Sequence, residues 1–318
     1  MSEREIPVFF ITGFMDSGKT SLINETIYGG EFKNDPGKKL IICCEDGDVE
    51  YNEEKLKTVN AKLCMIEDEE EFTTEKLRAI SREYNPDMVF IEYNGTWEVA
   101  PVYEMKMPAG WMLAQSICTV DSTTFEMYQN NMRAMINEQI FNAELVIFNR
   151  CDDNTPKRKF RGAVKAINRP AQIIYERLDG KVDTQEEELP YDINADVLDI
   201  TDADYALFFM DCMDHPKKYE GKTVHFLGLV YKPEDGSLKR NVFVPGRFAM
   251  TCCVDDIQFL GMKCKYDEAY TLTHRSWVDF TGKIKVEIAK EYRGIGPVLY
   301  AEKVLPAEKP DDELVYFT

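Results

Sequence analysis

The chain has 318 residues, of which 44% are hydrophobic and 30% are charged, and its formal net charge at pH 7 is −19. This composition excludes a largely disordered chain, and the length allows two separate domain cores. No local cluster of Lys or Arg offsets the acidic charge. We therefore expect no nucleic acid partner, because a phosphate backbone would be repelled.

The lengths of the apolar runs and the pattern of cysteines indicate the cellular compartment of the protein. No apolar run approaches the roughly 20 residues that cross a bilayer. Residues 1–11 lack the basic and apolar segments of a secretion signal. The nine cysteines are odd in number and scattered or adjacent, unlike a secreted disulfide framework. We expect a cytoplasmic protein with reduced thiols that is not an integral membrane protein.

The first half of the chain alternates β-rich runs with helix-like segments. The β-rich runs lie at residues 7–12, 39–44, 88–92, 116–120, 145–149 and 172–175. The helix-like segments lie at residues 17–27, 74–84 and 123–141. Strands that alternate with helices predict an α/β fold with a doubly wound, mostly parallel sheet.

The pattern changes after residue 178, where the chain becomes polar and acidic. We place a first domain at 1–180, an acidic linker at 181–199 and a second domain at 200–318. The second domain has one predicted helix at 202–214 and β-like runs at 223–231, 241–244, 257–265, 277–287 and 298–304. These elements predict a small β-barrel of the oligonucleotide/oligosaccharide-binding (OB) type.

Residues 13–20, GFMDSGKT, match the phosphate-loop pattern G-x-x-x-x-G-K-[ST] between a predicted strand and a predicted helix. The alternative is a chance glycine-rich turn. In a phosphate loop the backbone N–H groups face the phosphates, Lys19 reaches the β- and γ-phosphates, and Thr20 binds Mg²⁺. The residues predicted to bind nucleotide here are Gly13, Asp16, Ser17, Gly18, Lys19, Thr20 and Ser21.

A possible guanine-reading element, Asn149-Arg150-Cys151-Asp152, follows the strand at 145–149. It resembles the N-K-x-D tetrapeptide of GTPases with Arg in place of Lys. Asp152 would accept hydrogen bonds from the two guanine nitrogens, Asn149 would bond the base edge, and the stem of Arg150 would cover the ring. The alternative is a solvated strand end.

A second acidic strand, residues 87–92, ends at Glu92 and is followed by Gly95. We expect Glu92 beside Mg²⁺ and the Gly95 N–H near the γ-phosphate. Residues 44–48 form a candidate switch loop with carboxylates near the metal, or else a solvated acidic loop. The predicted catalytic residues are therefore Lys19, Thr20, Glu92 and Gly95.

These motifs together resemble the CobW-type GTPases over residues 6–178, a family linked to metal delivery and metal-cofactor insertion. The resemblance implies a P-loop GTPase domain that uses GTP and Mg²⁺ and handles Zn²⁺ or Co²⁺. It places Glu45 at the nucleotide Mg²⁺ or at a transported metal, beside Thr20 and Glu92. Of the C-x-C-C run that marks metal binding in the family, only Cys64 is present.

The second half resembles the C-terminal soluble domain of the YcgQ-type bacterial proteins, which accompany a predicted permease. The resemblance rests chiefly on the block MTCC-x-D at residues 250–255. Cys252, Cys253 and Cys264 are candidate ligands for a transition metal, or else small buried hydrophobic residues. Adjacent cysteines on a strand point to opposite faces, so a shared ion would require a bend there.

We expect a GTP-binding and GTP-hydrolysing switch protein linked to zinc or cobalt handling or to metal-cofactor insertion. The alternative is a non-enzymatic nucleotide-binding adaptor whose barrel recruits a permease, a metalloprotein or a corrinoid-related protein. Homodimerisation is a further expectation from related GTPases.

Overall fold

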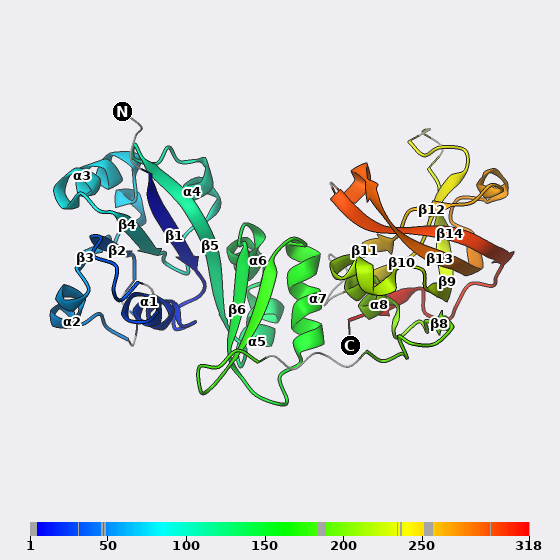
Figure 1. Ribbon diagram of the computed structural model, residues 1–318, viewed down its shortest axis with the longest axis horizontal. Helices are drawn as coiled ribbons and strands as arrows, with labels where there is room; N and C mark the ends of the chain where they lie inside the picture. The colour runs from blue at the N-terminus through cyan, green and yellow to red at the C-terminus, as the bar shows by residue number, and fades with distance from the viewer. Residues whose placement is uncertain are drawn as a thin grey trace. The chain divides into compact units, whose positions relative to one another are not determined.

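The computed structural model describes residues 5–30, 32–45, 47, 49–183, 189–233, 235, 237–250, 257–292 and 294–317. The chain divides into two compact units (Figure 1). Unit 1 consists of Met1–Thr155 and Ile167–Gln185, and unit 2 of Pro156–Ala166 and Glu186–Thr318. Among the described helices, none combines the length and the apolar character needed to span a membrane. The domain and linker boundaries drawn from the sequence stay predictions.

Unit 1 is built on a seven-stranded sheet in the order β3-β2-β4-β1-β5-β6-β7. All of its strand pairs are parallel. Its strands are β1 Ile6–Thr12, β2 Lys39–Cys43, β3 Ala61–Met65, β4 Met88–Glu92, β5 Trp111–Asp121, β6 Leu145–Cys151 and β7 Gln172–Arg177. Its helices are α1 Lys19–Tyr28, α2 Glu53–Thr58, α3 Thr74–Tyr84, α4 Ala100–Glu104, α5 Phe125–Asn131 and α6 Arg133–Phe141.

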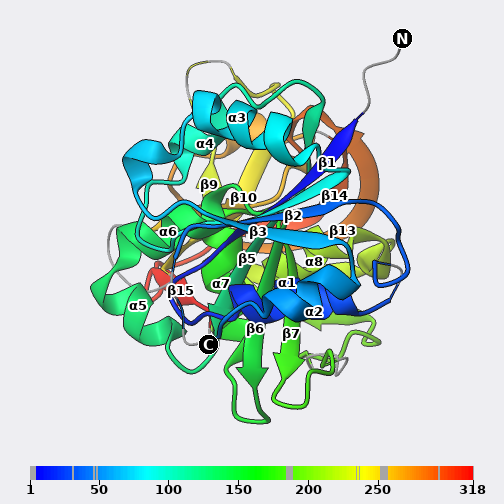
Figure 2. The same ribbon diagram turned by 90° about the vertical axis from the view of Figure 1, so that its left-hand side faces the viewer.

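Helices cover both faces of this sheet (Figure 2). Successive strand residues point to opposite faces, so each strand supplies two cores. The core with α3 and α4 contains Val8, Phe10, Leu77 and Val102. The core with α1 and α2 contains Ile11, Ile23, Ile27 and Leu56. The predicted doubly wound P-loop NTPase sheet is confirmed.

Local capping explains why α3 begins and ends where the sequence predicts. The Thr73 hydroxyl accepts a hydrogen bond from the Lys76 N–H at 3.2 Å, and Asn85 closes the helix with φ of 42°. Such caps satisfy backbone groups that the helix itself leaves without partners. The single helix predicted at 123–141 is wrong, because Met132 adopts φ −135° and ψ 38° and separates α5 from α6.

Unit 2 contains an eight-stranded sheet and two α-helices among its described residues. The helices are α7 Lys157–Ile167 and α8 Tyr205–Asp214. The strands are β8 Val197–Asp199, β9 Thr223–Tyr231, β10 Val242–Met250, β11 Gln258–Gly261, β12 Cys264–Lys265, β13 Trp277–Ala289, β14 Gly294–Pro306 and β15 Leu314–Tyr316. The run predicted at 257–265 is divided between β11 and β12 by a break at Met262 and Lys263.

The strand pairings of unit 2 close into a ring of five strands. β9 pairs with β10, β10 with β12, β12 with β14, β14 with β13, and β13 with β9. Only the β12–β14 pair in this ring is parallel. A ring of pairings leaves these strands with few free edges. The assignment of this domain to the OB type stays a prediction.

His225 on β9 lies between two carboxylates of neighbouring strands in unit 2. Its Nδ1 is 2.6 Å from Asp199 Oδ1 on β8, and its Nε2 is 3.1 Å from Asp279 Oδ2 on β13. Partial burial lowers the pKa of His225, but the hydrogen bonds and charges of the two aspartates outweigh it. The pKa therefore lies above the ordinary value of 6.5.

Replacing His225 with glutamine is expected to lower the stability of unit 2 in acid and to have little effect in alkali. A group whose pKa is raised in the folded state contributes its full stabilisation of the fold at pH values below its unfolded-state pKa, here about 6.5. This contribution is lost as the pH rises through the folded-state pKa. Melting temperatures of wild type and variant between about pH 5.5 and about pH 8.5 measure this. A difference that stays constant or grows toward high pH would contradict it.

Candidate functional site

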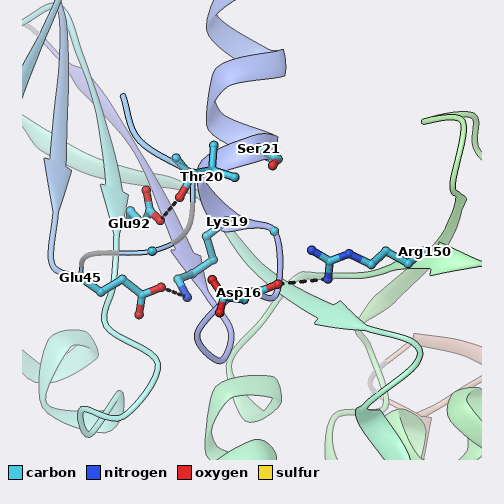
Figure 3. A pocket seen from close by; sticks show the side chains of 10 residues that line it. Asp16, Lys19, Thr20, Ser21, Glu45, Glu92 and Arg150 are labelled. Carbon is cyan, nitrogen blue, oxygen red and sulfur yellow. Dashed lines mark hydrogen bonds and ion pairs between the residues drawn. The ribbon is translucent and has the colours of Figure 1, made fainter. Parts of the chain in front are cut away.

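The residues of the predicted site meet at the carboxyl edge of the unit 1 sheet. Parallel strands bring their carboxyl ends to one edge, where ligands of doubly wound folds bind. The loops after β1 and β2, the start of α1 and the ends of β4 and β6 border one cavity there (Figure 3). The residues that line it are Asp16, Gly18, Lys19, Thr20, Ser21, Glu45, Gly47, Val49, Glu92 and Arg150. Asp46 and Asp48 of the predicted switch loop lie outside the described residues.

The two glycines of the phosphate loop are required by its backbone. Gly13 has φ of 130° and Gly18 has φ of 98°, which side chains rarely permit. A Cβ on Gly13 would lie 2.3 Å from Thr119 O, and one on Gly18 would lie 2.4 Å from Asn149 Nδ2. The loop can therefore pass close to β5 and β6 only with glycine at both positions.

Lys19 is held inside the loop, with only 2% of its surface exposed. Its Nζ donates to Gly13 O and Phe14 O, both at 2.8 Å, and pairs with Glu45 Oε1 at 2.5 Å. The other oxygen of this carboxylate, Glu45 Oε2, accepts from the Gly95 N–H at 3.0 Å. Glu45 thus joins the two groups that the sequence assigned to the terminal phosphate.

Thr20 and Glu92 form the oxygen-rich side of the cavity. The Thr20 hydroxyl donates to Glu92 Oε1 at 2.6 Å, and the Tyr51 hydroxyl donates to Glu92 Oε2. Burial raises the pKa of Glu92, while these two hydrogen bonds and the charge of Lys19 oppose the rise. A hydroxyl and a carboxylate side by side are the hard oxygen ligands that Mg²⁺ prefers, so these residues fit the predicted metal.

Asn149 and Arg150 join the end of β6 to the phosphate loop. Asn149 Nδ2 donates to Ser17 O at 2.6 Å. Arg150 adopts φ of 55°, and its guanidinium donates to Asp16 O at 3.0 Å and to Asp121 Oδ2 at 2.6 Å. Asp121 is the last residue of β5, and its role was not predicted. The predicted base-reading segment and the predicted phosphate loop therefore lie together.

Asp152 lies in the exposed loop after β6. Its Oδ1 accepts from the Asn154 N–H at 2.9 Å and from the Thr155 hydroxyl at 3.2 Å. The Asn154 backbone hydrogen bond is the main reason that the pKa of Asp152 is lowered. The carboxylate is therefore ionised at neutral pH, as an acceptor for two guanine N–H groups must be.

Gln139 on α6 contacts two loops of the candidate site, and the sequence did not reveal these contacts. It is 3% exposed, its Oε1 accepts from the Gly13 N–H at 3.1 Å, and its Nε2 donates to Gly95 O at 3.3 Å. Tyr51 was missed in the same way. Neither residue belongs to a local motif, because each reaches the site from a part of the chain distant in sequence.

The predicted transition-metal ligands are only partly described. Cys264 is fully buried on β12, and burial raises the pKa of its thiol. Cys252 and Cys253 lie outside the described residues. In the part of the chain that the structure describes, no group of three or more His, Cys, Asp or Glu side chains is placed to hold a metal ion. The cysteine site stays a prediction.

Comparison with solved structures gives distant likenesses. The chain is similar to the Zn(II)-bound YjiA GTPase from E. coli, with 20% identity, TM-score 0.43, and coverage of 57% of this chain and 60% of that chain. It is similar to the hydrogenase maturation factor HypB from Archaeoglobus fulgidus, with 21% identity, TM-score 0.39, and coverage of 55% and 82%. It also matches a Zn(II)-bound triple mutant of YjiA, with 16% identity, TM-score 0.43, and coverage of 72% and 74%. The chain thus spans less than two thirds of the first of these proteins.

Two family models together match almost the whole chain. The DUF1980 C-terminal domain matches residues 177–317, and the CobW/HypB/UreG nucleotide-binding domain matches residues 7–175. No curated protein matches. The relation to YcgQ-type proteins stays a prediction, whereas the resemblance to CobW-type proteins is confirmed. The CobW/HypB/UreG model covers more than half of the sequence, and the phosphate loop of this chain has the geometry described above. The chain therefore belongs to the CobW/HypB/UreG family of nucleotide-binding domains.

Proposed function

We propose that this protein binds GTP with Mg²⁺ and hydrolyses it to GDP and phosphate. One observation carries the proposal: Lys19, the Thr20–Glu92 pair and Arg150 border the same cavity at the carboxyl edge of the sheet. These groups are of the kinds that bind phosphate, a divalent cation and a base in P-loop nucleotidases. Phosphate release from GTP with and without Mg²⁺ tests it.

Each side chain has a distinct task in this proposal. Lys19 would hold the β- and γ-phosphates, and the Gly95 N–H would bind the γ-phosphate. Thr20 and Glu92 would hold Mg²⁺, which when bound neutralises phosphate charge. Tyr51 would orient the Glu92 carboxylate through its hydrogen bond to Oε2. Catalysis would come from positioning and charge stabilisation rather than from covalent chemistry.

Asp152→Asn is expected to weaken the preference for GTP over ATP by about tenfold or more. The asparagine would present an amide donor where guanine offers donors, so part of the recognition would be lost. Competition of GTP and ATP for the wild-type and variant sites measures the change. The neighbouring Asp153 pairs with Arg177 at 2.8 Å, and Asp153→Asn is a matched control with an unchanged preference. An unaltered ratio in Asp152→Asn would refute the base-reading role.

Metal handling by this chain is proposed from the family alone. The metal content of the purified protein, compared with that of a Cys252→Ser/Cys253→Ser variant, tests whether Zn²⁺ or Co²⁺ binds at the cysteines of unit 2. The cytoplasmic location, the metalloprotein, corrinoid-related or permease partner and the homodimer also stay predictions.

A further inference from the structure

The Glu45 carboxylate is almost completely enclosed by the groups around it. Its side chain is 4% exposed and that of its partner Lys19 is 1% exposed. One oxygen is 2.5 Å from Lys19 Nζ, and the other is 3.0 Å from the Gly95 nitrogen. A buried carboxylate with two such donors is well satisfied, because the cation and the N–H offset its loss of hydration.

The two donors on Glu45 are the two that the proposed function assigns to the γ-phosphate. A carboxylate and a terminal phosphate are both anions that accept several hydrogen bonds. Lys19 and the Gly95 N–H cannot direct the same hydrogens to both at once. A nucleoside diphosphate ends at the β-phosphate, so it competes with Glu45 at Lys19 only.

We propose that the Glu45 carboxylate occupies the position of the terminal phosphate of a nucleoside triphosphate, so that Glu45 determines how strongly the site distinguishes GTP from GDP. This inference rests on the proposed function and adds a specificity-determining residue to it. A triphosphate has to displace Glu45 from both donors, whereas a diphosphate leaves the Gly95 contact intact. Glu45 therefore weakens GTP binding relative to GDP binding.

Hydrogen bonds hold the backbone on both sides of the Glu45–Gly95 contact. The Glu45 side chain can therefore move away from its two donors while the backbone stays in place. The Asn94 Nδ2 donates to Cys44 O at 3.0 Å, which ties the residue before Glu45 to the loop that carries Gly95. Gln139 holds the carbonyl of Gly95 from the other side. In this proposal the position of the Glu45 carboxylate differs between the two nucleotide states, because it keeps the Gly95 contact with a diphosphate and loses it with a triphosphate.

The test compares the dissociation constants of GDP and of a non-hydrolysable GTP analogue for wild type and Glu45→Gln. The ratio of the GDP constant to the analogue constant is expected to rise about tenfold, because a neutral amide competes less well than a carboxylate for the Gly95 N–H, the donor that only the triphosphate has to take from Glu45. The measurement is made in Mg²⁺ and again in EDTA. The expected rise is present in both conditions, since the competition does not involve the metal.

Two further variants separate geometry from charge. Glu45→Asp keeps the charge but is one methylene shorter, so it cannot reach both donors and is expected to shift the ratio in the same direction. Glu54→Gln removes one negative charge from the exposed end of α2, where Glu54 pairs with Lys57 at 2.6 Å. This control is expected to leave the ratio unchanged.

Several results would overturn the inference. Weaker analogue binding by Glu45→Gln in Mg²⁺ but not in EDTA would make Glu45 a Mg²⁺ ligand instead. An equal change for both nucleotides would show that Glu45 acts on Lys19 alone. If wild type binds and hydrolyses GTP but the ratio never moves, only this inference fails. If wild type binds neither nucleotide, the proposed function fails and the inference with it.

Discussion

Lys19→Ala is expected to lower the rate of GTP hydrolysis by about a hundredfold or more, the scale seen when one preorganised donor to a developing charge is removed. The ammonium group lies inside the phosphate loop, held by two carbonyl oxygens and by Glu45. No other described cation lines the cavity except Arg150, which is bound to Asp16 O and Asp121. Phosphate release at saturating GTP measures the loss.

Loss of a buried lysine also destabilises the fold, so the experiment needs a matched control. Lys39 is 1% exposed in the same unit, and its Nζ donates to the carbonyl oxygens of Asp35, Gly37 and Val59. Lys39→Ala is expected to lower the melting temperature while the folded fraction keeps its turnover. Lys19→Ala protein that is folded and still hydrolyses GTP at the wild-type rate would refute the role of Lys19 at the phosphates. If neither wild type nor variant hydrolyses GTP but wild type binds it, the chain is a nucleotide-binding adaptor.

Gly95→Ala is expected to weaken GTP binding by about a hundredfold or more, on the scale of a few kcal/mol for a steric clash in a packed site. The added Cβ would lie 2.5 Å from Gly13 O and 2.6 Å from Phe14 Cα. Both are backbone atoms of the phosphate loop, so neither can rotate away as a side-chain tip can. Either this loop or the loop after β4 has to move, and each carries groups of the site. Titration with a fluorescent GTP analogue measures the effect.

A glycine elsewhere supplies the control for this substitution. Among the described residues, a Cβ on Gly294 would meet only Tyr292 O within contact distance, at 3.9 Å. Gly294→Ala is therefore expected to bind GTP as wild type does. Wild-type affinity in Gly95→Ala would mean that the two loops are not in contact when nucleotide is bound.

The site was predictable from the sequence where its chemistry is local. The loop from Gly13 to Thr20 is one continuous segment whose pattern specifies its own backbone shape. Glu92 was predictable because it ends a buried strand whose carboxyl end must lie at the ligand edge. Gln139 and Tyr51 were not, because each acquires its role from a partner on another element. Glu45 was predicted as a metal ligand, and its contact with Lys19 emerges only from the folded chain.

The same distinction holds for the fold. β4 and α3 were predicted with their observed ends, because β4 is a compact buried apolar run and α3 has a threonine cap and an asparagine stop. β3 was not predicted, since its residues AKLCM include no β-branched side chain and lie at the edge of the sheet. The short helices α2 and α4, of six and five residues, are too brief to show a helical period.

The Gln139 bridge has a consequence for the thermodynamics of binding. Its amide fixes the first N–H of the phosphate loop and the carbonyl of Gly95 at the same time. Part of the conformational entropy of these two loops is therefore lost when the chain folds rather than when the ligand arrives. A ligand that meets ordered loops loses less affinity to ordering them. Folding of α6 thus sets part of the nucleotide affinity before any nucleotide is present.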